Sequence, residues 1–184
     1  MSNQQGDRPL PVRIAQALIN LVSSARFQVD GDSMLPSLAS KQYVLVVPRR
    51  FSWNQLRRGD IVVLRHPVLS RHVYIKRIVG LPDEDIRLEG GQVSVNGRPL
   101  PEVRLNGQSY HRGEYDREWW IGSDEYFVMG DNRHNSQDSR TFGPINARLI
   151  IGRVWFRYWP LNTWGPIRGW SRAIASYADS TLMR

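Results

Sequence analysis

The chain has 184 residues, a formal net charge of +8 and no cysteine. This length is typical of one domain with a core of ordinary size, and the lack of cysteine excludes a thiol nucleophile, a zinc site with cysteine ligands and a disulfide framework. The positive charge favours an anionic partner, either nucleic acid or an acidic membrane surface. The arginines are scattered instead of forming a run, so we expect no nucleic-acid partner.

The first periodic segment follows a polar, flexible lead of residues 1–11. Apolar residues then recur at helical spacing and predict an amphipathic helix over residues 12–26. Gln16 and Asn20 interrupt its apolar content, so the segment predicts no full transmembrane helix, which needs about 20 predominantly apolar residues. We expect the helix either to pack on the domain core or to lie on a membrane surface. Its apolar residues are Ile14, Leu18, Leu21, Val22 and Ala25.

From Phe27 onward the pattern changes from helix to strand. Short β-branched runs bounded by proline, glycine or charge predict buried strands. Gly90-Gly91 separates two alternating runs, and Asn96-Gly97 follows the second, as hairpin turns do. The predicted strands are 43–47, 61–64, 72–79, 86–88, 93–95, 126–129 and 152–158.

Helical signals are few, so the strands predict a mainly β fold of folded antiparallel sheets or a distorted barrel, with the N-terminal amphipathic helix added. Proline and glycine are frequent over about 98–123, which predicts a small, partly irregular inserted subdomain within a domain of residues 27–160. The C-terminal tail, 161–184, mixes aromatic residues with arginines. It is expected to cover the core or to form a membrane-interface patch, and the first interpretation is favoured.

Ser33 lies between Gly31 and Pro36, in a turn that the proline can hold rigid. Such a turn suits a nucleophile, although a serine in a short loop is also typical of a helix N-cap. The G-x-S-x-G pattern of a nucleophile elbow is incomplete because position 35 is leucine, which weakens a hydrolase triad. A serine nucleophile needs a base to take its proton, so the few histidines and lysines become the candidates.

Lys41 and Lys76 are the only lysines of the chain. Lys41 lies in a polar turn, whereas Lys76 lies in a predicted strand whose period of two puts Tyr74 and Ile78 on its face and Arg77 on the other. Burial among such neighbours lowers the pKa of a lysine and allows it to act as a general base near neutral pH. The alternative is an edge-strand lysine whose ammonium reaches water.

A polar loop over residues 130–140 is the third chemical feature of the chain. It does not fit a calcium loop, because Arg133 occupies a position that needs an oxygen ligand and no closing glutamate follows. Its serines, aspartates and arginines are suited to hold a lysine amine and to brace the loop through an Asp–Arg pair. We expect neither a metal nor a cofactor.

Four stretches of the chain, in order and at compatible spacing, resemble the type I signal peptidases, an S26-type family of serine proteases with a Ser/Lys dyad. The resemblance covers roughly residues 27–160. Any one stretch is a weak signal. The four together are a strong one, because a chance match would also have to place both Ser33 and Lys76 correctly. The four stretches are GDSMLPSL (31–38), RGDIVV (58–63), YIKRIVGLP (74–82) and GDNRHNSQDSRTFGP (130–144).

The resemblance implies that Ser33 attacks the scissile carbonyl, that Lys76 takes its proton and later activates water, and that Ser136 orients the lysine amine. The Ser33 backbone amide would donate to the oxyanion. Some relatives add a side-chain hydroxyl two residues before the nucleophile, which Gly31 cannot supply. The remaining implied site residues are the supporting Gly130, Asp131 with Arg77, and Asp138 with Arg140, and the substrate-pocket walls Met34 and Ile75.

The resemblance also implies the substrates, which are precursor polypeptides with signal peptides, cleaved after small residues at the first and third positions before the bond. It implies a location at the cell membrane with the active site on the extracytoplasmic side. Members usually carry spanning helices before the nucleophile. We therefore expect peripheral attachment to the membrane surface through residues 12–25 and the basic tail, or an anchor supplied by another subunit.

Three other functions remain open. A specialised Ser/Lys maturation protease for one precursor fits the lack of a predicted anchor. A self-cleaving repressor uses the same chemistry, but it needs an N-terminal DNA-binding module, and 32 residues precede Ser33. A non-catalytic binding module is the least favoured alternative, because Ser33, Lys76 and Ser136 are all present.

Overall fold

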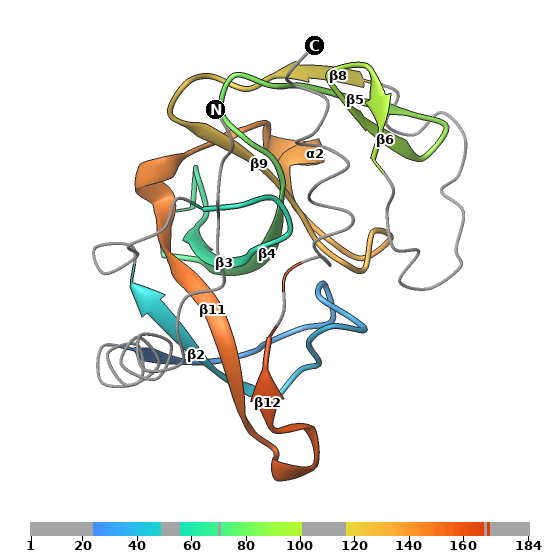
Figure 1. Cartoon of the computed structure of the whole chain (residues 1–184). Helices are drawn as coiled ribbons and strands as arrows, with labels where there is room; N and C mark the ends of the chain where they lie inside the picture. Colours follow the sequence, from blue (N-terminus) through green and yellow to red (C-terminus); the bar gives the residue numbers. More distant parts are fainter. Residues whose placement is uncertain (1–23, 49–55, 70, 101–116, 168, 170–184) are drawn as a thin grey trace, which may run out of the picture.

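The structure is a computed structural model and consists of two antiparallel β-sheets, one of eight strands and one of four. The large sheet curls around the centre of the molecule, and the small sheet lies at one end (Figure 1). The mainly β fold predicted from the strand pattern is therefore confirmed. The structure describes residues 24–48, 56–69, 71–100, 117–167 and 169.

The large sheet has the strand order β1-β2-β11-β3-β4-β9-β10, and β12 pairs with β11 outside this path. All of its neighbouring strands run antiparallel, and register shifts occur along β11 and between β4 and β9. Such irregularities bend a strand and increase its twist, which is consistent with the curl of the sheet. The strands are β1 Ala25–Gln28, β2 Tyr43–Pro48, β3 Ile61–Arg65, β4 Val73–Gly80, β9 Glu125–Met129, β10 Ile145–Asn146, β11 Ile150–Trp159 and β12 Gly165–Pro166.

The centre of the large sheet is buried on both faces. In β3, Val63 packs into one apolar cluster and its neighbour Val62 into another. Successive side chains of a strand point to opposite faces, so both clusters need apolar residues from the same strand. This explains why the sequence of β3 is a continuous apolar run instead of an alternating one.

The small sheet has the order β7-β6-β5-β8. Its two predicted hairpin turns are confirmed: Glu89 pairs with Gln92 across the two glycines, and Asn96 and Gly97 have φ of 50° and 73° between β6 and β7. The predicted insertion of about 98–123 contributes only β7 and β8, so the small sheet begins before it; residues 101–116 lie outside the described part. The strands are β5 Asp85–Glu89, β6 Gln92–Val95, β7 Arg98–Pro99 and β8 Arg117–Trp120.

The segments on either side of the predicted domain, the helix before it and the tail after it, differ from expectation. Most of the predicted helix 12–26 lies outside the described residues, but Ala25 and Arg26 belong to β1, not to a helix. Ala25 pairs with Val46 of β2 and Arg26 with Leu45, so sheet hydrogen bonding decides their conformation. In the part of the chain that the structure describes, no helix is long and apolar enough to cross a membrane.

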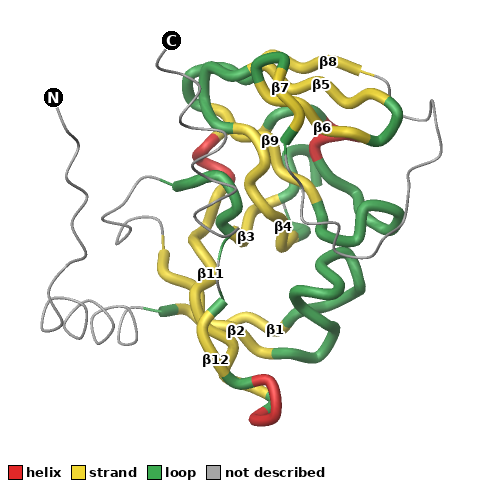
Figure 2. The backbone as a smooth tube through the Cα atoms, turned by 45° about the vertical axis from the view of Figure 1, so that its right-hand side comes forward, coloured by secondary structure: helices red, strands yellow, loops and turns green. Residues whose placement is uncertain are grey.

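The tail begins with the 3-10 helix η3 Leu161–Thr163 and strand β12. Leu161 is 71% exposed and Trp164 is 62% exposed, so the favoured prediction that the tail covers the core is wrong for these two residues. Trp164 packs edge-on against Phe156, with ring centroids 4.9 Å apart. This turn projects at the end of the molecule opposite the small sheet (Figure 2). The tail residues 168 and 170–184 lie outside the described range.

Candidate active site

Ser33 lies in the connection between β1 and β2. Its turn is closed by the Leu35 N–H, which donates to the Asp32 carbonyl at 3.1 Å, and Leu38 N–H donates to the Met34 carbonyl at 2.9 Å. Met34 is buried in the apolar cluster beneath β2, whereas Ser33 is only half-buried. The turn is therefore anchored by its apolar residue, while Ser33 itself stays partly exposed.

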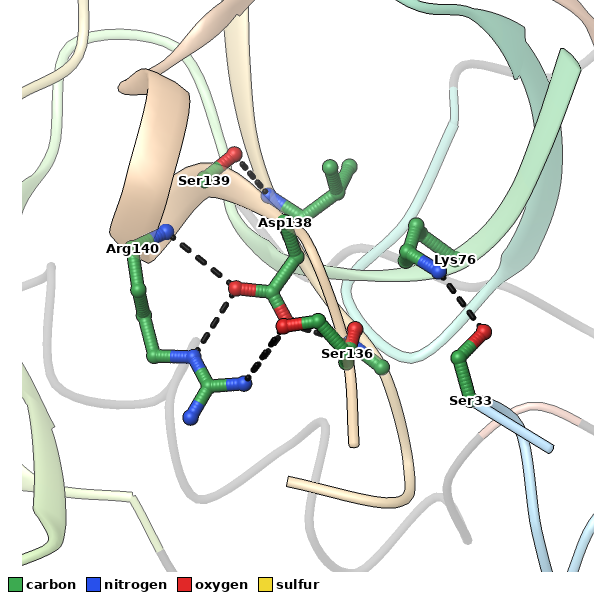
Figure 3. A network of polar contacts seen from close by, with 8 residues as sticks. Ser33, Lys76, Ser136, Asp138, Ser139 and Arg140 are labelled. Carbon is green, nitrogen blue, oxygen red and sulfur yellow. Dashed lines mark hydrogen bonds and ion pairs between the residues drawn. The ribbon is translucent and has the colours of Figure 1, made fainter. Parts of the chain in front are cut away.

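Lys76 lies in β4, where its backbone pairs with Val62 of β3. Its Nζ donates to the Ser33 Oγ at 2.7 Å (Figure 3). The Tyr74 ring, two residues earlier on the strand, has its centroid 5.1 Å from the Nζ. The structure thus brings together the two residues of the predicted dyad, which are 43 positions apart in the chain.

The Lys76 side chain is deeply buried, since the residue is only 3% exposed. This burial lowers the pKa of Lys76 from 10.5 to about 8; the charge of Asp138 opposes the shift, Arg140 adds to it, and Asp131 opposes it. A buried amine loses its hydration, which penalises the charged form. The amine is therefore neutral in a useful fraction of molecules near neutral pH.

Asp138 organises the polar loop that follows β9. It caps the short helix α2 Ser139–Phe142, and its carboxylate accepts hydrogen bonds from the Gly130 N–H at 2.9 Å and from Arg140 Nε at 2.8 Å (Figure 3). Burial opposes its charge, but the hydrogen bonds and charge of Arg140, with the Gly130 N–H, outweigh burial and lower the pKa of Asp138. The site therefore contains a buried, negatively charged carboxylate whose charge favours the ammonium form of Lys76.

Arg77 points away from Lys76, as the strand period predicts, but it is buried. Its Nε and Nη2 donate to the Asp131 carboxylate at 2.7 and 2.6 Å, and its Nη1 donates to the Gly59 carbonyl at 2.7 Å. A further contact of 3.1 Å reaches the Ser37 hydroxyl. One guanidinium therefore ties the lysine strand to the polar loop and to the nucleophile segment.

Ser136 packs against Gly130. A Cβ at Gly130 would clash with the Ser136 side chain and come within 2.6 Å of the Ser33 carbonyl oxygen, so this position needs glycine. The buried Ser136 hydroxyl makes no hydrogen bond of ordinary geometry with the described residues, although it lies close enough to Asp138 to help lower its pKa. The predicted contact with Lys76 is thus not formed in this geometry.

The two predicted pocket residues each neighbour one residue of the dyad, since Met34 follows Ser33 and Ile75 precedes Lys76, and they share one apolar cluster. Met34 is a buried member of that cluster, and the half-buried Ile75 packs against it. Nothing in the described segments resembles a metal site, because they contain no suitable group of three or more His, Asp or Glu.

Asn132 is a site residue that the sequence reasoning did not single out. Its backbone N–H donates to the Ser33 carbonyl at 3.0 Å, and its side-chain Nδ2 donates to the Asp32 carbonyl at 3.2 Å. The residue stands within the GDNR stretch, yet nothing in that pattern tells which segment its amide would contact.

A serine hydroxyl in contact with a buried lysine amine, held on a curled antiparallel sheet, defines a serine peptidase of the Ser/Lys type. Residues 8–159 match the family described as "Signal peptidase, peptidase S26". The chain belongs to this family, as its four sequence stretches predicted, and it is a serine endopeptidase.

Two named relatives agree with this assignment. The chain is 35% identical over 169 residues to a signal peptidase I of Leptolyngbya laminosa. This alignment covers 86% of this chain and 79% of that protein. It is 33% identical over 159 residues to a signal peptidase I of Bacillus caldolyticus, covering 79% and 85%. A crystal structure of a signal peptidase I from Enterococcus faecalis has 27% sequence identity and a TM-score of 0.48, covering 55% of this chain and 98% of that one.

Proposed function

We propose that this peptidase removes signal peptides from exported precursor proteins through an acyl-enzyme on Ser33, with Lys76 as the general base. The contact of 2.7 Å between the Lys76 Nζ and the Ser33 Oγ carries this proposal. It is within the range needed for proton transfer. With a pKa of about 8, roughly a tenth of the lysine amines are neutral at pH 7.

In acylation, the neutral Lys76 amine accepts the hydroxyl proton of Ser33 across this contact. The Ser33 Oγ forms a bond to the scissile carbonyl carbon, and the carbonyl electron pair moves onto its oxygen. The Ser33 backbone N–H donates to this oxyanion. When the tetrahedral intermediate collapses, the C–N bond breaks and the Lys76 ammonium gives its proton to the departing amine.

In deacylation, the again neutral Lys76 takes a proton from water. The resulting hydroxide attacks the ester carbon, and the ester bond to Ser33 breaks. The serine oxygen recovers a proton from the Lys76 ammonium, which restores the starting state. One buried amine therefore serves as base and acid in both halves of the reaction.

The surrounding polar residues hold the dyad in place. Arg77 with Asp131 fixes the lysine strand against the polar loop, and Asp138 with Arg140 fixes the loop itself. The Asp138 carboxylate also stabilises the ammonium that forms when Lys76 takes the proton. We assign Ser136 the role of orienting the amine during the reaction; its buried hydroxyl and its packing on Gly130 support this assignment.

We assign Ile75, which is half-buried, to the wall that substrate side chains before the scissile bond would meet. Met34 is only 1% exposed and lies in the apolar cluster on which Ile75 packs, so it would support this wall from beneath. The substrate class itself rests on membership of the family, whose members named here are signal peptidases.

The catalytic assignment is tested with a peptide that carries a secretory cleavage site. Ser33→Ala is expected to abolish cleavage. Lys76→Arg is expected to do the same because a guanidinium stays protonated, whereas Lys41→Arg provides the matched control at the exposed lysine. Cleavage by Ser33→Ala or Lys76→Arg at the wild-type rate would remove the dyad from the mechanism. Cleavage of one precursor only would favour a specialised maturation protease.

We further propose that the enzyme works at the surface of the cell membrane, on its extracytoplasmic side, held directly or through an anchor subunit. The turn at the β11–β12 end, which projects from the molecule in Figure 2, contains a cluster of large apolar residues whose side chains are exposed. Tryptophans beside aliphatic residues are typical of membrane interfaces, and the charge of +8 favours anionic lipid. The cluster consists of Trp159, Leu161 and Trp164.

Vesicle flotation tests this location. Wild-type protein is expected to float with vesicles that contain an anionic lipid, and replacing Leu161 and Trp164 by serine should reduce the bound fraction several-fold. Trp120→Ser is the matched control, because Trp120 is 65% exposed but lies in the small sheet at the other end of the molecule. A wild-type protein that stays wholly soluble would contradict peripheral attachment, and equal flotation of the double variant would exclude this cluster.

A further inference from the structure

Both peptide groups that flank the Ser33 α-carbon are held by the same residue of the polar loop. Asn132 donates from its backbone N–H to the Ser33 carbonyl at 3.0 Å and from its side-chain Nδ2 to the Asp32 carbonyl at 3.2 Å. The second carbonyl also accepts the Leu35 N–H that closes the turn. The nucleophile turn is therefore fixed from within and from a segment 100 residues away.

The Asp32 carbonyl and the Ser33 N–H belong to one planar peptide group. In a trans peptide they point in opposite directions, so a hydrogen bond that fixes the carbonyl also fixes the direction of the N–H. Within the segments that the structure describes, no acceptor takes the Ser33 N–H. This donor is thus free for a substrate oxygen, and its direction is set by the bonds on the other side of its own peptide plane.

The orientation of this donor is unusually important here because position 31 is glycine. No hydroxyl two residues before the nucleophile can share the charge of the oxyanion. A donor that is already oriented stabilises the developing charge without reorganisation during the reaction. A peptide plane free to rotate would lose that advantage.

We propose that Asn132 is a positioning residue for the oxyanion site: its side-chain amide orients the Asp32–Ser33 peptide so that the Ser33 N–H faces the oxygen of the tetrahedral intermediate. This inference rests on the proposed function of Ser33 as the nucleophile. Asn132 follows Asp131, whose carboxylate is held by Arg77 beside Lys76. The same loop therefore sets the direction of the donor and the position of the base.

The test compares Asn132→Asp with Asn132→Ala. Asp keeps the shape of the side chain but replaces the donor by an acceptor, and both variants keep the backbone bond to the Ser33 carbonyl. Removing a whole oxyanion donor lowers kcat by about 100- to 1,000-fold in comparable sites, so a donor that is only misdirected is expected to lower kcat by about 10- to 100-fold with KM within twofold. Asn135→Asp and Asn135→Ala are the matched controls on the exposed part of the same loop.

A second readout separates positioning from a general loss of structure. A peptide boronate that forms a tetrahedral adduct on Ser33 should bind the Asn132 variants more weakly by the same factor as kcat/KM falls. A peptide with a reduced scissile bond, which has no oxyanion, should bind within twofold of wild type. In Asn132→Ala, which adds no charge near Lys76, the pH at which kcat reaches half its maximum should not move, because Asn132 acts on the serine peptide and not on the lysine amine.

Three results would overturn the inference. One is an unchanged kcat in both Asn132 variants while cleavage still depends on Ser33, which leaves the proposed function intact. Another is equal weakening of the boronate and the reduced peptide, which would show a substrate-binding or structural role. If wild type and Ser33→Ala cleave equally, the proposed function fails, and this inference fails with it.

Discussion

Lys76 is subject to two opposing requirements. Its amine must be buried to be neutral near physiological pH, yet burial of the ammonium form destabilises the folded chain. The low pKa of about 8 is the direct result of that burial, and Asp138 limits it by favouring the charged form. Catalysis at this position is therefore obtained at the expense of stability.

The variant Lys76→Met makes this conflict measurable. Folded wild type loses the Lys76 proton near pH 8, whereas an unfolded lysine keeps it to about 10.5. Below pH 8 both states are protonated and folding must bury the charge, which corresponds to roughly 3 kcal/mol; the penalty disappears as the pH rises from 8 to 10.5. Urea unfolding should therefore show the variant to be more stable than wild type at pH 7, with the gap closing by pH 10. A variant less stable at pH 7 would contradict the assignment.

Asp138→Asn should lower the stability of the folded protein, whereas Lys76→Met should raise it. It leaves the buried Arg140 without its counter-charge, and breaking a buried ion pair costs about 3–5 kcal/mol. Because the pKa of Asp138 is lowered in the folded state, the carboxylate stabilises the protein above its ordinary pKa of 3.8 and loses this effect as the pH falls below it. Urea unfolding should show a large deficit at pH 7 that shrinks below pH 4.

The exposed Asp85→Asn provides the control for that stability measurement.

Asp138→Asn should also change the kinetics, since Asp138 raises the pKa of Lys76. The acidic limb of the kcat profile should therefore move to lower pH in Asp138→Asn. An unchanged limb would show that this carboxylate does not influence the amine.

Among elements, the polar loop between β9 and α2 contributes most to the site. It supplies Asn132 to the nucleophile turn, Asp131 to the lysine strand and Asp138 to α2. It can approach the nucleophile turn this closely because Gly130 has no side chain.

Gly130→Ala tests this close approach. The new Cβ would clash with Ser136 and lie 2.6 Å from the Ser33 carbonyl oxygen, so the nucleophile turn must shift. A displacement of about 1 Å can lower a rate 100-fold, and a loss of at least about tenfold in kcat is expected. At Gly122 the nearest atom to a new Cβ is the end of the Glu125 side chain at 3.1 Å, so Gly122→Ala should remain close to wild type. A folded Gly130→Ala enzyme with wild-type kcat would contradict this account.

The elements were largely predictable, because their signals are local. The period of two around Lys76 correctly placed Tyr74 and the lysine on one side of β4 and Arg77 on the other. The pair of Arg77 with Asp131, 54 residues further along the chain, was implied only by the family resemblance, because nothing in the sequence of β4 itself indicates that Arg77 is buried. The contacts of Asn132 were not predictable: an amide in a polar loop gives no local sign of which carbonyl it will bind.

At the scale of the whole molecule, the two sheets are joined at the turn after β4. Arg58, which precedes β3, donates to the Val79 carbonyl and to the Glu84 carboxylate, and Glu84 also accepts the Leu81 N–H at 2.7 Å. In this turn Asp83 has a positive φ of 61°, which aspartate tolerates better than most residues.

Glu84→Gln tests the importance of this junction. It leaves Arg58 buried without a counter-charge and is expected to lower the free energy of unfolding by about 3–5 kcal/mol. Glu118→Gln removes the partner of Arg87 in an ion pair on the surface of the small sheet, where about 0–1 kcal/mol is expected. Equal effects of the two substitutions in urea unfolding would contradict a structural role for the buried pair.

The long-range organisation was less predictable than the site. Residues 98–123 look like an insertion because proline and glycine are frequent there, but sheet pairing extends the small sheet back to Asp85. The end of the predicted helix at Ala25 and Arg26 was overridden by pairing with β2. The exposed Trp164 could not be distinguished from a core tryptophan by its residue type alone.

The most direct test of the central claim is the titration of Lys76 itself. With only two lysines in the chain, a sample labelled with ¹³C at the lysine ε-carbon gives two side-chain signals, and Lys76→Met identifies the catalytic one. We predict that this signal titrates near pH 8 and that kcat rises with the same midpoint. A Lys76 signal that titrates near the ordinary lysine value of about 10.4, in an enzyme already fully active at pH 8, would contradict the proposal that neutral Lys76 is the base for Ser33.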